Sequence, residues 1–240
     1  CGEDWFLVTN EGSVNGRVFK TPFTNRARDS WVEVLPGDEQ ISYGGIDAFA
    51  SHVVIGARKN GVPGFFILDP DKGTTRWITA PGEGASLQGE YSPEYNSTTQ
   101  RFSYDTFLQP YAVAEVELVT GEIRILKQKA SPPGYDPDKY RVERTFATAP
   151  DGTKIPLWLL LPANFPRDGS GAILLDGYGA YGIAIDPWFD SDVFSLVDRG
   201  VGYALAQIRG GGEFGRTWYE AGKLEHKTTT FTDYIACAEH

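Results

Sequence analysis

Methionine is absent from the 240-residue sequence, cysteine occurs only twice, and no apolar run is long. A membrane-spanning helix needs about 18 consecutive apolar residues, so we expect no membrane partner. The first residues, CGEDWFLVTNEG, carry acidic side chains where a secretory signal carries a basic segment, which predicts a soluble, cytoplasmic protein. Cys1 and Cys237 have no metal-ligand spacing around them, so we expect inert thiols in a reducing compartment and no metal site.

Positive charge is also scarce, because 22 Lys and Arg stand against 32 Asp and Glu, for a net charge of -10. Nucleic acids and anionic membranes both require a basic face, so this balance argues against a nucleic-acid partner. The composition, 41% apolar and 13% aromatic, is sufficient for a sizeable core and predicts a globular protein of one or two domains. Because the chain opens on Cys1 and lacks methionine, we expect an internal piece of a longer protein.

Residues 1–130 consist of short predicted strands that recur in three similar units. Each later unit ends in a strand, an acidic or glycine-containing turn and a second strand, as in FFILDPDKGTTRWIT and AVAEVELVTGEIRIL. A period of roughly 40 to 45 residues with several strands per unit is typical of propeller blades. A β-sandwich is the alternative, but its strands have no reason to repeat the same ending in register. We therefore predict a β-propeller part of about three blades, too few to close a ring.

Residues 131–240 differ in composition and predict the N-terminal part of an α/β domain, with the proline-rich linker KASPPGYDPDKY at the junction. A strand pair around the turn APDGTK comes first, and the apolar strands GAILLD and VGYALAQIR then alternate with helical segments. The last segment predicts a helix with a capping box formed by Thr230 and Asp233. Its apolar face consists of Phe231, Tyr234, Ile235 and Ala238. The alternation predicts a largely parallel sheet covered on both faces.

Two glycine-rich turns follow the apolar strands, at the edge where open α/β sheets bind ligands. The second turn, RGGGEFGR, matches G-x-G-x-x-G at Gly210, Gly212 and Gly215, and Asp233 lies near the offset of a ribose contact. A dinucleotide site is therefore one interpretation. Against it, Glu213 would place a carboxylate inside the phosphate loop, where the helix amides favour an anion. The pattern also comes after a strand and a helix, whereas the fingerprint opens the first βαβ unit.

The first turn, GYGAYG, combines glycines with Tyr178 and Tyr181. Acyl transfer requires preorganised donors aimed at the oxygen that becomes negative, and a tyrosine hydroxyl on a rigid turn at the mouth of a sheet is such a donor. Gly177 and Gly179 allow the backbone to approach a substrate. The alternative is that both tyrosines cap the core with their hydroxyls in water, and the residue types leave both interpretations open.

Three longer stretches carry a resemblance to a known family. They are ILKQKASPPGYDPDKYRVERTFATAPDGTKIPLWLLLP, GYGAYGIAIDPWF, and the run from SLVDRG to TDYIACAE. Together they resemble the oligopeptidase B group of the prolyl oligopeptidase family of serine peptidases, most strongly from about Arg124 to Glu239. The aromatic strands and RFSYDTFLQP resemble the propeller of that family. The length of the match favours this resemblance over the dinucleotide interpretation.

The resemblance implies a seven-bladed propeller covering an α/β-hydrolase domain, with an enclosed active site that admits only short peptides. It implies cleavage after Arg or Lys by Ser-His-Asp acyl transfer, without a cofactor, and short basic peptides as partners. By motif matching, Tyr178 is the implied oxyanion-hole donor and Tyr181 borders the implied S1 substrate pocket. Cleavage after Pro and a non-catalytic propeller that binds peptides or proteins are the alternatives.

Two departures from the family pattern matter. Asp176 stands where the family commonly has a tyrosine or another bulky residue, and a carboxylate there needs a partner or solvent. The nucleophile elbow G-x-S-x-G is absent from the second half. We therefore expect the hydrolase domain to be truncated before the nucleophile, with no catalytic Ser, Asp or His in this chain and no activity from it alone. We assign no catalytic role to His52, His226, His240, Ser191 or Ser195.

Overall fold

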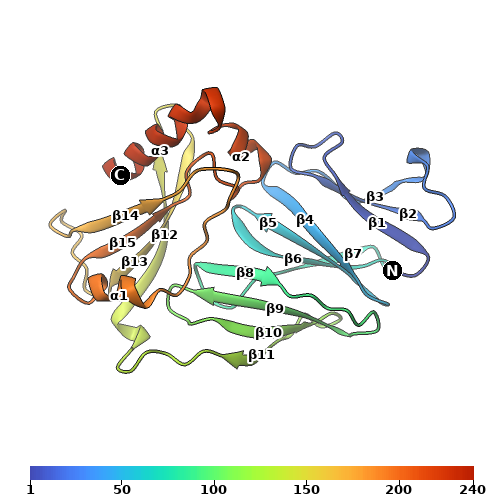
Figure 1. Ribbon diagram of the computed structural model, residues 1–240, viewed down its shortest axis with the longest axis horizontal. Helices are drawn as coiled ribbons and strands as arrows, with labels where there is room; N and C mark the ends of the chain where they lie inside the picture. Colours follow the sequence, from blue (N-terminus) through green and yellow to red (C-terminus); the bar gives the residue numbers. More distant parts are fainter.

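The strands of the protein are divided among four sheets in a computed structural model that describes residues 1–240 (Figure 1). The first sheet contains β1 (Asp4–Thr9), β2 (Arg17–Pro22) and β3 (Val32–Leu35), with a 3-10 turn, η1 (Arg28–Ser30), before β3. The second contains β4 (Ile41–Ala48), β5 (Val53–Lys59), β6 (Val62–Asp69) and β7 (Thr74–Ile78). The third contains β8 (Ala85–Gly89), β9 (Thr99–Thr106), β10 (Ala112–Glu117) and β11 (Ile123–Gln128).

Each of these three sheets is an antiparallel meander whose strands pair in sequence order. The strand-turn-strand endings expected from the sequence are the hairpins β6–β7 and β10–β11. This is the arrangement of propeller blades, and it confirms the predicted β-propeller part.

The three blades pack face to face, so the middle blade is buried on both sides. In β5, Val53 and Ile55 pack toward the first blade, whereas Val54 packs toward the third. In β6, Phe66 faces the first blade and Phe65 the third. This follows from the period of two in a strand, which sends successive side chains to opposite faces. Three stacked sheets with a doubly buried middle sheet exclude the two-sheet β-sandwich alternative.

The fourth sheet is formed by the second half of the chain. After η2 (Pro137–Lys139) come β12 (Tyr140–Thr148), β13 (Lys154–Pro162), β14 (Ile173–Gly177), α1 (Ser191–Val197), β15 (Gly202–Ala206), α2 (Arg216–Glu220), η3 (Leu224–His226) and α3 (Lys227–Glu239). The strand order is β12-β13-β15-β14. Only β14 and β15 pair in parallel, while β12–β13 and β13–β15 are antiparallel. The predicted strand pair around APDGTK is the β12–β13 hairpin. The expectation of a largely parallel sheet is nevertheless wrong for these residues, because β15 lies between β13 and β14 and is antiparallel to β13.

Helices cover the two faces of this sheet (Figure 1). On one face, Phe194 and Val197 of α1 pack with Trp158 and Leu160 of β13. On the other, Cys237 of α3 packs against alternating residues of the same strands. The second apolar strand is thus sandwiched between helices as expected, whereas β14 lies at the edge of the sheet with Ile173 and Leu174 exposed.

The predicted orientation of α3 is also wrong. Phe231 and Ile235 of its apolar face are 61% and 55% exposed. The buried side chains are instead Thr230, Asp233, Ala236 and Cys237. Thr230 and Asp233 lie inside the helix, which begins at Lys227, so they form no capping box. These two polar residues can be buried because each meets a polar partner, Thr230 the Arg209 carbonyl and Asp233 the Arg209 side chain.

Polar contacts join the propeller blades to the second half of the chain. The buried side chain of Asn15, in the β1–β2 loop, accepts from the Arg216 amide at 2.9 Å and donates to the Phe214 carbonyl at 3.1 Å. Arg58 of β5 forms a two-pronged ion pair with Asp186, in which one N–O distance is 2.9 Å. The Asn15 contacts hold the loop after β15 against the first blade, and the Arg58–Asp186 pair holds the segment between β14 and α1 against the second blade.

Candidate active site

Tyr178 immediately follows β14, at the carboxyl end of a strand in the open sheet. Its side chain is 45% exposed, so the hydroxyl can reach a bound molecule. Gly179, the next residue, adopts φ +61, and a Cβ atom there would lie 2.6 Å from side-chain carbons of Ile208 and Thr230. The glycine is required both by the left-handed backbone and by the lack of space. The sequence therefore places an exposed tyrosine next to a tightly packed turn.

Tyr181 lies at the tip of the same turn and is 80% exposed. Its φ of 56 is in the left-handed region, which a residue with a Cβ adopts at an energetic cost. Such strain at an exposed aromatic residue is a feature that functional sites tend to retain. Tyr178 and Tyr181 thus belong to one turn that presents two phenol rings to solvent.

The carboxylate of Asp176 has partners on the neighbouring strand and on its own backbone. The Tyr203 hydroxyl donates to Asp176 Oδ2 at 2.8 Å, and the Gly177 amide donates to Oδ1 at 2.7 Å. Burial and this hydrogen bond raise the pKa of Tyr203, so its hydroxyl stays protonated. The Asp176 side chain therefore links β14 to β15 through a diagonal contact and has the polar partners that a carboxylate at this position needs.

The two glycine turns pack directly against each other. The Gly182 amide donates to the Gly210 carbonyl at 3.0 Å. A Cβ on Gly210 would overlap the Gly179 carbonyl, and one on Gly212 would overlap the Gly182 carbonyl. The glycines of the second turn thus permit contact with the first turn.

A phosphate has no place in the second turn. Glu213 is 1% exposed, and its Oε1 accepts from the Ile185 amide at 2.9 Å. Burial raises the pKa of Glu213 to about 7. Asp233, the expected ribose contact, is fully buried and bound to Arg209. Glu213 thus occupies the turn, and the glycines of the turn pack against the first glycine turn. The second turn therefore does not fit the dinucleotide interpretation.

A buried ion cluster stabilises the second turn, and sequence reasoning did not identify it. Arg209 donates to Asp233 at 2.8 and 2.6 Å and to Asp151, in the β12–β13 turn, at 2.6 Å. The Arg209 guanidinium lowers the pKa of Asp151, and hydrogen bonding to Asp233 raises the pKa of Arg209. The sequence instead predicts a capping box of Thr230 with Asp233, and no local pattern links Asp233 to Arg209, 24 residues before it.

The histidines and serines to which we assign no catalytic role are dispersed over the structure. His52 bonds its neighbour Ser51 at 2.9 Å within the second blade. His240 contacts the Thr145 hydroxyl at 3.2 Å, and the Ser195 hydroxyl donates to the Asp192 carbonyl at 2.7 Å. His226 is an exposed residue before α3. No serine–histidine–carboxylate arrangement is present in residues 1–240.

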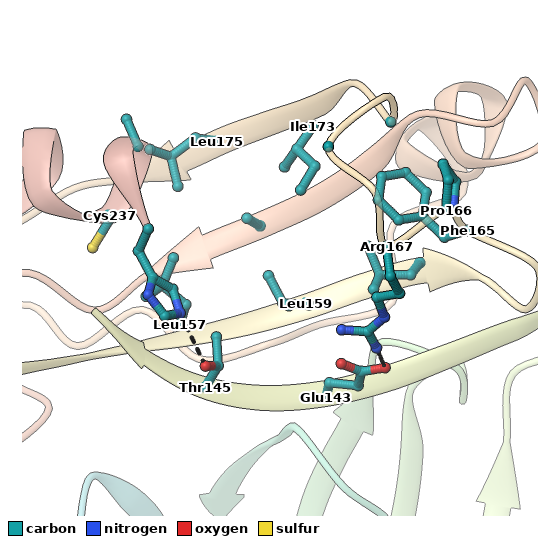
Figure 2. A pocket seen from close by; sticks show the side chains of 16 residues that line it. Glu143, Thr145, Leu157, Leu159, Phe165, Pro166, Arg167, Ile173, Leu175 and Cys237 are labelled. Atoms are coloured by element: carbon teal, nitrogen blue, oxygen red, sulfur yellow. Dashed lines mark hydrogen bonds and ion pairs between the residues drawn. The ribbon is translucent and has the colours of Figure 1, made fainter. Parts of the chain in front are cut away.

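The hollow drawn in Figure 2 has a volume of about 460 Å³ and lies on the α3 face of the sheet. Its walls are mainly aliphatic, with the Arg167–Glu143 ion pair and the Thr145–His240 contact at its edge. Cys237 lines it, but burial raises the pKa of this thiol to about 12, so the nucleophilic thiolate is suppressed. Neither Tyr178 nor Tyr181 borders this hollow.

The protein contains no disulfide, because both cysteines are free thiols. No group of three or more His, Cys, Asp or Glu side chains gathers in a way that could hold a metal ion. None of the helices is long and apolar enough to cross a membrane.

Stacked meander blades followed by a helix-covered sheet define a propeller protein that continues into an α/β-hydrolase domain. Residues 1–129 match the N-terminal β-propeller domain of prolyl oligopeptidase, and residues 187–240 match the prolyl oligopeptidase family. The chain therefore belongs to the prolyl oligopeptidase family.

Curated relatives and solved structures agree with this family. Dipeptidyl aminopeptidase BI of Pseudoxanthomonas mexicana is 36% identical over 241 residues, covering 100% of this chain and 33% of the relative. Protease 2 of Moraxella lacunata is 31% identical, covering 99% and 34%. The structure of oligopeptidase B from Trypanosoma brucei matches with a TM-score of 0.87 at 32% identity, covering 100% of this chain and 35% of that one. The chain spans about a third of the length of the curated relatives it matches.

Proposed function

We propose that this chain is part of a serine peptidase that hydrolyses short peptides after Arg or Lys, with Tyr178 as a donor to the oxyanion. The nucleophilic serine and its histidine and aspartate are proposed to lie outside residues 1–240. Support comes from the family and from the similarity to oligopeptidase B structures.

The observation that carries the proposal is the exposed Tyr178 on a closely packed turn at the carboxyl end of β14. Open α/β sheets bind ligands at this edge. A phenol hydroxyl that is held in place before the reaction stabilises developing negative charge without reorganisation. A tyrosine that only capped the core would not require the strained, crowded backbone that surrounds it.

In the proposed reaction, a serine hydroxyl attacks the peptide carbonyl carbon while a histidine accepts its proton. The carbonyl oxygen becomes negative and accepts a hydrogen bond from the Tyr178 hydroxyl and another from a backbone amide. The C–N bond then breaks, and the histidine donates the proton to the leaving amine. Water releases the acyl group in the same way. Tyr181 is proposed to border the pocket for the side chain that precedes the cleaved bond.

Replacing Tyr178 with Phe in the product of the complete gene tests the role of the hydroxyl. Loss of one oxyanion donor lowers kcat by about 100- to 1000-fold in related chemistry, and we expect a loss of this size with a much smaller change in KM. Steady-state kinetics on a fluorogenic Arg peptide measures both constants. Equal kcat in the two proteins would remove Tyr178 from the site.

The substrate class is tested with paired fluorogenic peptides that carry Arg or Pro before the cleaved bond, with and without a serine-directed phosphonate inhibitor. Inhibitor-sensitive turnover after Arg supports the proposal. Preference for Pro would contradict cleavage after Arg or Lys and would favour the alternative of cleavage after Pro. A relative named prolyl endopeptidase is 27% identical to this chain. No turnover by the folded protein would favour the non-catalytic module that binds peptides or proteins.

Release of dipeptides from free amino termini is a second candidate function. It is favoured by the 36% identity to a protein named dipeptidyl aminopeptidase BI, which exceeds the 31% to protease 2. A matched pair of dipeptide substrates, one with a free amino group and one acetylated, distinguishes the two. An enzyme that accepts both is an endopeptidase, whereas one that requires the free amino group releases dipeptides.

We also propose a cytoplasmic location. The two thiols are free in the folded chain, as expected for a reducing compartment. Fractionation of cells with an antibody to the protein tests this location.

A further inference from the structure

Helix α3 contacts the Tyr178 turn through a lysine that has no part in the proposed reaction. We propose that Lys227 is a positioning residue for Tyr178, because its ammonium group fixes the turn that presents the phenol hydroxyl. The inference rests on the proposed role of Tyr178 and adds a residue to that site.

The Lys227 ammonium holds the peptide group between Gly179 and Ala180, one peptide group beyond the one that directly follows Tyr178. Its Nζ donates to the Gly179 carbonyl at 2.6 Å and to the Thr230 hydroxyl at 3.2 Å. A hydrogen bond from an ionised donor is shorter and about twice as strong as one between neutral groups. Displacement of the Gly179–Ala180 peptide group, which lies in the same turn as Tyr178, would therefore break a strong contact.

Thr230 cannot replace this contact. Its hydroxyl lies 2.8 Å from the Arg209 carbonyl, 3.2 Å from the Gly222 carbonyl and 3.4 Å from the Gly179 carbonyl. A hydroxyl has only one proton to donate, and the shortest of these distances is to Arg209. Lys227 is therefore the principal donor to the Gly179 carbonyl.

The same helix also fixes the backbone on the other side of Tyr178. The Tyr234 hydroxyl donates to the Leu175 carbonyl at 2.7 Å. Side chains of α3 thus bind the Leu175 carbonyl, before Tyr178 in the chain, and the Gly179 carbonyl, after it. Since its own side chain is 45% exposed, backbone contacts, more than burial, determine where the phenol hydroxyl lies.

A small displacement of a catalytic group strongly lowers the rate of an enzyme. A shift of about 1 Å in a catalytic group can reduce the rate by about 100-fold. Lys227→Met keeps an unbranched side chain of similar length and removes only the charged donor. In the product of the complete gene, we expect kcat on the preferred peptide to fall by about 10- to 100-fold, with KM changed by less than about twofold. Lys227→Arg keeps a cationic donor and should recover part of the rate.

Lys223→Met is the matched control. The Lys223 ammonium lies 3.5 Å from Glu220 and over the Tyr219 ring, and it donates to no carbonyl of the Tyr178 turn. We expect wild-type kcat from this variant. Wild-type kcat from Lys227→Met as well would overturn the inference.

A double-mutant cycle shows whether Lys227 acts through Tyr178. If it does, the variant with both Lys227→Met and Tyr178→Phe should be no slower than Tyr178→Phe alone. Losses that multiply would overturn the inference. If Tyr178→Phe itself has wild-type kcat, the proposed function of Tyr178 is wrong, and this inference is wrong with it. An impaired Tyr178→Phe beside an unimpaired Lys227→Met contradicts this inference alone.

Hydrogen exchange provides a readout that does not depend on activity. Amides of residues 177–182 should exchange faster in Lys227→Met than in wild type and Lys223→Met, while amides of the propeller strands remain unchanged. Unchanged exchange in the turn, or faster exchange throughout the protein, would contradict a positioning role for Lys227.

Discussion

At the scale of single residues, Arg209 and its two carboxylates are the most constrained polar group of the second half. Asp233 is fully buried and accepts from both the side chain and the backbone amide of Arg209. Asp151 adds a partly exposed third member. A buried charge is tolerated only while its partners are present, and removing one partner leaves the other uncompensated.

Replacing Asp233 with Asn keeps the shape of the side chain and removes its charge. Because the buried guanidinium of Arg209 then retains only the more exposed Asp151, we expect the free energy of unfolding to fall by about 3 kcal/mol. Urea unfolding of the product of the complete gene measures this change. Glu239→Gln, at an exposed position of the same helix, is the control and should be neutral. An equal free energy of unfolding for Asp233→Asn and wild type would show that the charge of Asp233 in the ion cluster does not stabilise the fold.

At the scale of elements, the two glycine turns and helix α3 form one interlocked unit. Gly210 has φ +98, and its Cα faces the Gly179 carbonyl with no space for a further carbon. The contact allows the strand-end turns of β14 and β15 to meet. Side-chain atoms of α3 then reach both turns.

Comparing Gly210→Ala with Gly200→Ala separates two contributions to the loss of stability, steric crowding and the left-handed backbone conformation. Gly200, with φ +88 and no atom within 4 Å of the point that a Cβ would occupy, is the matched control for conformation alone. We expect Gly200→Ala to lower the melting temperature slightly, through a cost of about 1 kcal/mol. Gly210→Ala should cost at least about 2 kcal/mol more, because the turns must move apart. Equal melting temperatures for the two variants would show that the turns are not interlocked.

At the scale of the whole molecule, buried acids lie where the propeller meets the second half. Asp186 pairs with Arg58 of β5, yet burial raises the pKa of Asp186. Glu213 lies near both residues, and burial raises its pKa to about 7. A raised pKa in the folded state means that stability is greatest when the carboxyl is protonated and is lost as the pH rises.

This effect is tested by comparing the unfolding free energy of wild type and Glu213→Gln between pH 5 and 8. The unfolded-state pKa is near the ordinary value of 4.5, and the folded-state value is about 7. Wild type should therefore lose stability relative to Glu213→Gln as the pH rises through this window, by about 3 kcal/mol in total. The control Glu220→Gln removes an exposed acid whose pKa is lowered by Arg216, so it titrates below the window. A pH-independent difference between wild type and Glu213→Gln would contradict the prediction.

Much of the architecture could be predicted from local patterns. The blades were predictable because alternating apolar residues and turn signals recur within each unit, and strand pairs such as β6–β7 need only a short connection. The parallel content of the fourth sheet and the exposed face of α3 were predicted incorrectly. The parallel content depends on which strands are neighbours in the sheet. The buried face of α3 depends on whether a polar residue such as Asp233 meets a partner. Hydrophobic periodicity contains no information on strand order or on polar partners.

The candidate site divides in the same way. The sequence by itself determined that an exposed tyrosine turn follows an apolar strand, because glycines with a left-handed backbone and a strand end are local features. Only the tertiary structure decided what holds that turn. Lys227 and the Gly179 carbonyl are 48 residues apart, Tyr203 and Asp176 are 27 apart, and Arg209 and Asp233 are 24 apart. Such contacts form only when the sheet order and the helix orientation are set by packing of the whole chain, so no local pattern encodes them.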